Sequence, residues 1–169
     1  HTDARMAAKA AGARIVILRE VTEDTYVNGA MTADYRKVLA ESNAVAAILT
    51  NGSRVRMTTA LGTDMSFSAK GRTAISVGGV IAPPRMSTAL PTGEGAISPA
   101  EGTTEGTLVV DHSIDGIGIL SEPVTFTIRK GLVVDIQGGK EVKRLREIMG
   151  EDEAARNIAE FAVGTNPLS

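Results

Sequence analysis

The chain has 169 residues, a formal net charge of −2 and a pI near 5.7, which suits one compact domain or two small ones and gives no electrostatic reason to bind nucleic acid. It contains no cysteine, so disulfides and thiolate metal sites are excluded. No apolar run approaches the roughly 20 residues that span a bilayer, and no secretory signal is recognisable, so we expect a cytoplasmic protein with no membrane partner.

Both ends of the chain resemble internal segments of a longer protein. The first residue is His1 rather than Met, and residues 164–169 follow directly on a helix-ending signal. Aromatic residues make up only 3% of the chain and Trp is absent, which leaves aliphatic residues and Met to form the core. We therefore expect a fragment.

The first third of the chain predicts helices around one strand. Asp3 is suited to begin the first helix and Gly12 to end it. The strand is a short, β-branched apolar run, which favours burial on both faces, as in a parallel sheet. The expected elements are a helix over residues 3–12, a strand over 15–18, and helices over 33–41 and 44–50.

From residue 54 onward, apolar and polar residues alternate, which is typical of half-buried strands. The clearest hairpin has a Lys130-Gly131 turn. One face of each of its strands carries the apolar residues, which are Val124, Phe126 and Ile128, then Leu132, Val134 and Ile136. Strands are expected over residues 54–59, 64–68, 107–113, 124–129 and 132–136, and helices over 141–149 and 152–163.

These elements predict an α/β fold class in two parts. Residues 1–53 are expected to be the end of an α/β domain, a fragment of an α/β layer. Residues 54–169 are expected to form a β-rich α+β catalytic domain that is truncated at its C-terminus.

The Gly- and Pro-rich segment over residues 78–106 is the first place to look for function, because long irregular loops in compact domains are often functional. Within it, Glu94 lies between two glycines, so a metal or substrate can approach its carboxylate closely. Spacing alone nevertheless favours a solvated loop residue. Glu101 and Glu105 fit surface charges better still.

The other candidate residues give weaker signals. Glu160 falls off the apolar arc of the last expected helix, so its position alone predicts an exposed carboxylate. His1 and His112 are the only histidines, and no histidine cluster with metal-ligand spacing can form from them.

Several segments, taken together in order and spacing, resemble the metal-dependent aminopeptidase T family, also called the thermophilic aminopeptidases. Leu90-Pro91-Thr92-Gly93-Glu94 and the closing segment from Glu160 through Gly164-Thr165-Asn166 are the more specific elements. The resemblance covers most of residues 54–167. Its segments are 61–68 with 71–72, 90–94, 104–111, 129–135 and 160–167.

This resemblance implies a two-metal hydrolase that releases N-terminal amino acids from peptides and works as a homodimer. It implies that Glu94 and Glu160 are metal ligands, whereas their positions alone predict exposed surface carboxylates. The implied metal is zinc, cobalt, manganese or magnesium. The family's remaining His, Tyr, His and Asp ligands would lie beyond Ser169. We therefore expect the two carboxylates to converge, and the 169-residue chain alone to be catalytically silent.

Two alternatives remain open. Ring-cleaving dioxygenases of the dihydroxypyridine type resemble aminopeptidase T but hold a single ferrous iron through downstream His and Asp ligands. Because this chain retains both Glu residues of the two-metal site, the peptidase is modestly favoured over the dioxygenase. The other alternative is a non-catalytic scaffold domain. The presence or absence of His, Tyr and a closing His-x-Asp within about 70 residues after Ser169 distinguishes a metal site from a scaffold.

Overall fold

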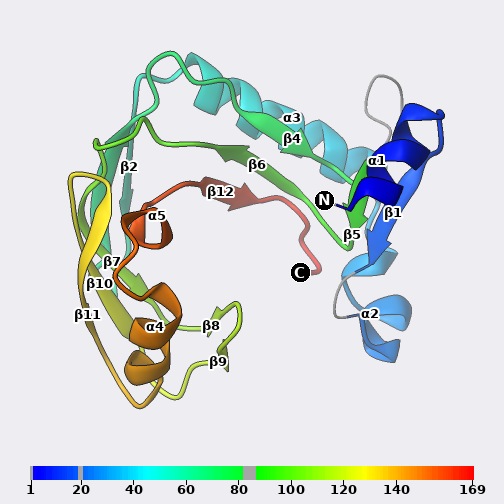
Figure 1. The fold of residues 1–169 in the computed structure, drawn as a ribbon. Helices are drawn as coiled ribbons and strands as arrows, with labels where there is room; N and C mark the ends of the chain where they lie inside the picture. Colours follow the sequence, from blue (N-terminus) through cyan, green and yellow to red (C-terminus); the bar gives the residue numbers. More distant parts are fainter. Residues whose placement is uncertain (1, 19–20, 82–86) are drawn as a thin grey trace. The chain divides into compact units, whose positions relative to one another are not determined.

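The computed structural model describes residues 2–18, 21–81 and 87–169. Its elements are a mixture of helices and mostly antiparallel sheets, which confirms the expected fold class (Figure 1). Among the described residues, no helix has both the length and the apolar character needed to cross a membrane.

The chain forms two compact units, and each is assembled from several segments. The first contains His1–Asn51, Thr73–Ile97 and Phe161–Ser169, and the second contains Gly52–Arg72 and Ser98–Glu160. The Pro-Thr-Gly-Glu segment and residues 161–169 of the closing segment therefore belong with the first 51 residues, whereas Glu160 belongs to the second unit. The division into continuous domains at residue 53 stays a prediction.

In the first unit, a long helix packs on a three-stranded sheet. The helix α3 (Tyr35–Asn51) replaces the two helices expected over residues 33–50. Its buried residues recur every three or four positions, the spacing of one helix face: Val38, Ser42, Ala46 and Leu49. The sheet has β6 (Glu94–Ile97) at its centre, antiparallel to β4 (Ile75–Val77) and β12 (Phe161–Gly164) (Figure 1).

The rest of the first unit begins with α1 (Asp3–Ala10), which Thr2 caps rather than Asp3. The predicted strand β1 (Ile15–Leu18) is confirmed, and it pairs in parallel with β5 (Ser87–Leu90). The prediction that both faces of β1 are buried was wrong, because alternate side chains of this strand are about half exposed. The unpredicted elements are α2 (Glu23–Val27), which begins with a Thr22 capping box, and the 3-10 helix η1 (Ala30–Thr32).

The second unit is built on a five-stranded antiparallel sheet with the order β11-β10-β7-β3-β2. The predicted strand pair near residue 60, the hairpin and the helix over 141–149 are confirmed. The elements are β2 (Arg54–Thr58), β3 (Asp64–Ser68), β7 (Glu105–Val110), β8 (Ser113–Ile114), β9 (Gly118–Ile119), β10 (Val124–Arg129), β11 (Leu132–Gln137), α4 (Glu141–Met149) and α5 (Glu153–Arg156).

The β10–β11 hairpin has the predicted turn but not the predicted faces. Lys130 and Gly131 have φ of 49° and 80°, as a tight two-residue hairpin turn requires. The register then shifts in a β-bulge, so that Ile128 pairs with Val133 and Thr127 with Asp135. Because a bulge breaks the two-residue alternation, Val133 and Ile136 are buried while Val134 is 55% exposed.

The helix expected over residues 152–163 was also wrong. Helix α5 ends at Arg156, and Asn157 then bridges to Leu132 while the Ile158 amide donates to the Gly131 carbonyl. Phe161–Gly164 continues as strand β12 on β6. These residues obtain backbone partners from strands distant in sequence, which overrides their helical spacing.

Candidate functional site

Glu94 is the first residue of β6, the central strand of the first unit's sheet (Figure 1). It stands opposite Val77 of β4 on one side and Gly164 of β12 on the other. Its side chain is half-buried. A residue paired on both sides has a fixed backbone, so its carboxylate is held by regular sheet rather than by a loose loop.

The two glycines beside Glu94 are required by the close approach of α3. A Cβ at Gly93 would lie 2.7 Å from Val38 Cγ1, and one at Gly95 would lie 2.6 Å from Val45 Cγ1. Both glycines therefore face α3. Because successive strand residues point to opposite faces, Glu94 projects from the sheet face that α3 does not cover.

The closing Gly-Thr-Asn segment holds the Glu94 strand in place. Asn166, only 8% exposed, donates from its amide to the carbonyls of Ala30 and Thr92 at 3.0 and 3.2 Å, and its oxygen accepts from the Leu168 amide. The Thr165 amide donates to the Gly93 carbonyl at 2.8 Å. The two motifs singled out in the sequence are thus joined residue to residue.

A second attachment ties this pair of motifs to α3. The hydroxyls of Thr165 and Ser42 hydrogen-bond at 2.7 Å, and the Ser42 hydroxyl donates to the Val38 carbonyl. Ser42 is fully buried. The sequence carries one signal for this role, because Ser42 is a polar residue on an otherwise apolar stripe of the helix.

Glu160 is placed differently from Glu94. It is exposed, lies in an irregular segment just before β12, and belongs to the second unit, whereas Glu94 belongs to the first. The convergence of the two carboxylates therefore stays a prediction. The helical context assumed for Glu160 was wrong, although its exposure agrees with the interpretation from position alone.

The remaining sequence candidates have local structural partners. Glu101 forms an ion pair with Arg72, and hydrogen bonds from its own backbone amide and then from Arg72 hold the pKa of its carboxyl below the ordinary value. Glu105 accepts from the Lys130 amide at 2.8 Å. His112 is exposed, and its carbonyl accepts from the Leu120 amide.

The described part of the chain does not supply a metal site of its own. Over residues 2–18, 21–81 and 87–169, no group of three or more His, Cys, Asp and Glu side chains could hold a metal ion. A tight site for a divalent metal generally needs three or four protein ligands. The residues present therefore do not fit a complete metal centre.

The chain is similar to a protein family and to proteins of known structure. A family model described as NicX, 2,5-dihydroxypyridine 5,6-dioxygenase, matches residues 1–169. A solved 2,5-dihydroxypyridine dioxygenase from Pseudomonas putida KT2440 is similar with a TM-score of 0.78 and 23% identity, over 97% of this chain and 48% of that one.

A second solved structure, wild-type AmpT from Thermus thermophilus, is similar with a TM-score of 0.58 and 20% identity, over 78% of this chain and 35% of that one. The chain thus spans about half or less of these two proteins. At 23% and 20% sequence identity, the similarity to these two structures establishes a shared fold and nothing further. No curated protein matched.

Proposed function

The chain belongs to the 2,5-dihydroxypyridine 5,6-dioxygenase family, and from this premise we propose that the whole protein opens the ring of a dihydroxypyridine with dioxygen. The observation that carries the proposal is the match of the family model to residues 1–169. The shared fold with the Pseudomonas putida dioxygenase, over 97% of this chain, supports it.

The predicted aminopeptidase activity was wrong, and with it the assignment as a hydrolase acting on peptides. The whole-chain match to the dioxygenase family overturns it. The likeness to AmpT covers less of the chain, at a lower TM-score. The dioxygenase alternative is better supported than the peptidase. In the sequence, the presence of the two Glu residues had favoured the peptidase.

The structure gives a physical reason for the error. The motifs that suggested a peptidase contain residues that assemble the fold: Gly93 lets α3 approach β6, and Asn166 and Thr165 bind the backbone at Thr92 and Gly93. Two enzymes that share this scaffold can share these residues without sharing a reaction.

The proposed reaction follows from the family's activity by atom balance. A dioxygenase places both oxygen atoms of O₂ in its product. Cleavage between carbons 5 and 6 breaks that ring bond, converts the hydroxyl-bearing carbon 5 into a carboxyl group and leaves carbon 6 as a formyl group on the nitrogen. The acyclic product therefore carries a carboxylate at neutral pH.

Membership in this family implies a metal cofactor, and we propose ferrous iron as its identity. The described residues alone do not form its site, so no step is derived through the metal. Glu94 is our candidate for the first unit's contribution to the active site, because its backbone is fixed by two neighbouring strands and its side chain leaves the face opposite α3.

Oxygen incorporation by the full-length, iron-loaded protein tests the proposal. With 2,5-dihydroxypyridine under ¹⁸O₂, we expect one O₂ consumed per ring opened and a product that carries two labelled atoms. Hydrolysis of Leu-Ala, measured in parallel, should be absent. A product with one labelled atom, or no oxygen uptake in the presence of bound iron, would contradict a dioxygenase.

Two substitutions in the same protein test the site residues. If Glu94 acts on the substrate, Glu94→Gln should lower kcat at least about a hundredfold while iron content stays unchanged. If it is a metal ligand, as first predicted, iron content should fall as well. Glu160→Gln is the matched comparison. A loss of iron in this variant would identify Glu160, the second predicted ligand, as a residue that binds the metal.

A further inference from the structure

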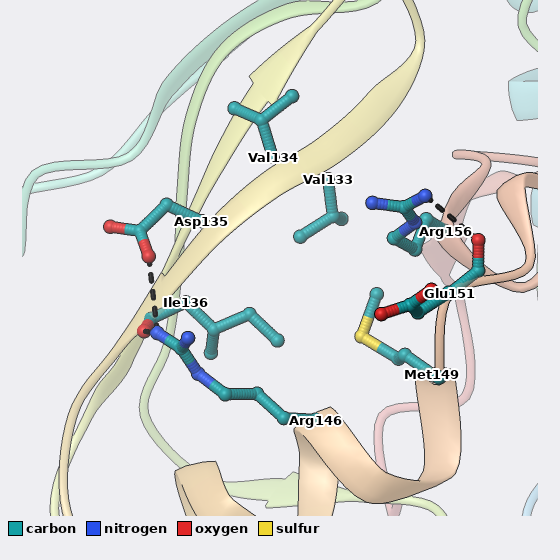
Figure 2. A pocket seen from close by; sticks show the side chains of 9 residues that line it. Val133, Val134, Asp135, Ile136, Arg146, Met149, Glu151 and Arg156 are labelled. Atoms are coloured by element: carbon teal, nitrogen blue, oxygen red, sulfur yellow. Dashed lines mark hydrogen bonds and ion pairs between the residues drawn. The ribbon is translucent and has the colours of Figure 1, made fainter.

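The second unit contains a pocket that neither the predicted site residues nor the proposed function involves. Its volume is about 320 Å³, and it lies between β11 and the segment that runs from α4 into α5 (Figure 2). The apolar residues of its lining are Val133, Val134, Ile136 and Met149, and the charged residues are Asp135, Arg146, Glu151 and Arg156. Such a volume falls at the lower end of the range of small-molecule sites.

The β-bulge in β11 shapes this pocket. In a regular strand, alternate residues would leave the sheet face, but the register shift at Thr127/Ile128 buries both Val133 and Ile136. Figure 2 shows these two side chains with Met149 around the hollow, Met149 facing them from the end of α4. Bulges often re-aim side chains beside functional sites.

The two arginines of the pocket are not equivalent. The guanidinium of Arg146 already has protein partners at the edge of the pocket. It pairs with Asp135 Oδ1 at 3.1 Å and donates to the Ile136 carbonyl at 2.7 Å (Figure 2). Among the described residues, Arg156 makes one hydrogen bond, from Nη2 to the Glu151 carbonyl at 2.9 Å. Its Nε is buried and has no partner among the described residues.

An unpaired buried donor on a permanently charged group is costly. Arg156 has no carboxylate partner among the ion pairs of the described residues, so a carboxylate in the pocket would supply the countercharge that the protein does not. Because Nε has almost no accessible surface, the ligand would meet the guanidinium at its two terminal nitrogens. A carboxylate matches the forked guanidinium best. The Glu151 side chain, also at the pocket, disfavours a ligand with a second negative charge.

We propose that this pocket binds a small organic monocarboxylate with an apolar body. The carboxylate pairs with Arg156, and the body packs against Val133, Ile136 and Met149. The inference does not rest on the dioxygenase activity, because it uses only residues of the second unit.

Benzoate is a suitable probe, and benzamide is its uncharged match in shape. The chain has six methionines, so with ¹³C-methyl methionine labelling the Met149 methyl signal reports this pocket by NMR. We expect benzoate to shift that signal saturably, with benzamide at least about tenfold weaker. The methyls of Met57 and Met65, on β2 and β3, line no part of the pocket and should not move.

Three variants sharpen the test. Arg156→Gln should weaken benzoate binding at least about tenfold, whereas Arg144→Gln, an exposed arginine on α4 paired with Glu147, removes the same charge and should change it less than about threefold. Glu151→Gln should tighten binding, because it removes the repelling charge. This last variant alters an exposed side chain, so it keeps the test valid if Arg156→Gln fails to fold.

Three results would overturn the proposal. One is an unmoved Met149 signal at tens of millimolar benzoate. Another is equal binding of benzoate and benzamide, which would mean apolar contact without carboxylate recognition. The third is Glu151→Gln binding benzoate no more tightly than the wild type.

Discussion

The side-chain amide of Asn166 is satisfied at both of its ends by buried or half-buried backbone. Replacing it with Ala leaves the carbonyls of Ala30 and Thr92 and the amide of Leu168 without their partner. We expect Asn166→Ala to lower the free energy of unfolding by about 1–3 kcal/mol, measured by urea denaturation with an unchanged m-value.

Asn51→Ala is the matched control for that substitution. Asn51 makes one local hydrogen bond, from its amide to the Ala47 carbonyl, at the exposed end of α3. Its loss should cost less than about 0.5 kcal/mol. Equal effects of the two substitutions would show that the Asn166 bridge does not stabilise the first unit.

Glycines at adjacent strands give a second residue-level contrast. An added methyl at Gly95 would lie 2.6 Å from Val45 Cγ1 and 2.9 Å from the Ala46 amide nitrogen, whereas one at Gly164 meets nothing within 4 Å. We expect Gly95→Ala to destabilise the chain by about 1–3 kcal/mol. Gly164→Ala should be nearly neutral, and thermal unfolding of both variants compares them directly.

If Gly95→Ala is as stable as the wild type, the close packing of α3 on β6 does not determine stability. The comparison is clean because neither glycine has a positive φ, so backbone strain does not enter. Both substitutions add the same methyl group, and only its surroundings differ.

At the scale of elements, α4 is fastened to the loop before β10 by a buried carboxylate. Glu141 accepts from the Ser121 amide and hydroxyl, both at 3.0 Å. The Ser121 hydroxyl is the largest cause that lowers the pKa of this carboxyl, and burial opposes it. The first turn of a helix also favours a negative charge.

The sign of the pH effect follows from that lowered pKa. The folded state favours the ionised form, so the stabilisation is fully present above about pH 4.3, the ordinary Glu pKa, and is lost as pH falls through the lower folded pKa. We expect the stability difference between wild type and Glu141→Gln to shrink below that pH. Glu147→Gln, exposed on the same helix, is the control, and a pH-independent difference for Glu141→Gln would contradict this account.

Elements specified by local pattern could be predicted from the sequence, and elements specified by distant pairing could not. The Lys130-Gly131 turn and the helix over 141–149 depend on neighbouring residues, and both were confirmed. Strand β12 was missed because its partner β6 lies more than sixty residues earlier. The bulge in β11 has no such local signal, and it changed which side of the strand is buried.

The same distinction applies to the candidate site. Glu94 was predicted as a candidate because glycines flank it. In the structure, those glycines allow α3 to pack closely against the strand. Ser42 was not singled out, and Asn166 was noted only as part of a motif, because their partners are 123 and 136 residues away. The pocket around Arg156 likewise depends on the bulge, which the sequence did not predict.

At the scale of the whole molecule, the two carboxylates predicted as metal ligands belong to different compact units. The described residues contain no group of three or more potential ligands. The homodimer also stays a prediction, and gel filtration of the full-length protein would test it.

The 169-residue chain should therefore bind divalent metal weakly. Complete structural zinc sites gain about 10–16 kcal/mol, and one or two carboxylates without imidazole partners should reach only a fraction of that, which corresponds to roughly micromolar affinity or weaker. Equilibrium dialysis against zinc, manganese and, without oxygen, ferrous iron measures it. Glu101→Gln, a surface carboxylate paired with Arg72, is the control for non-specific charge effects. One tightly held ion per chain that is lost in Glu94→Gln or Glu160→Gln, but retained in Glu101→Gln, would show that these residues build a metal centre within this chain.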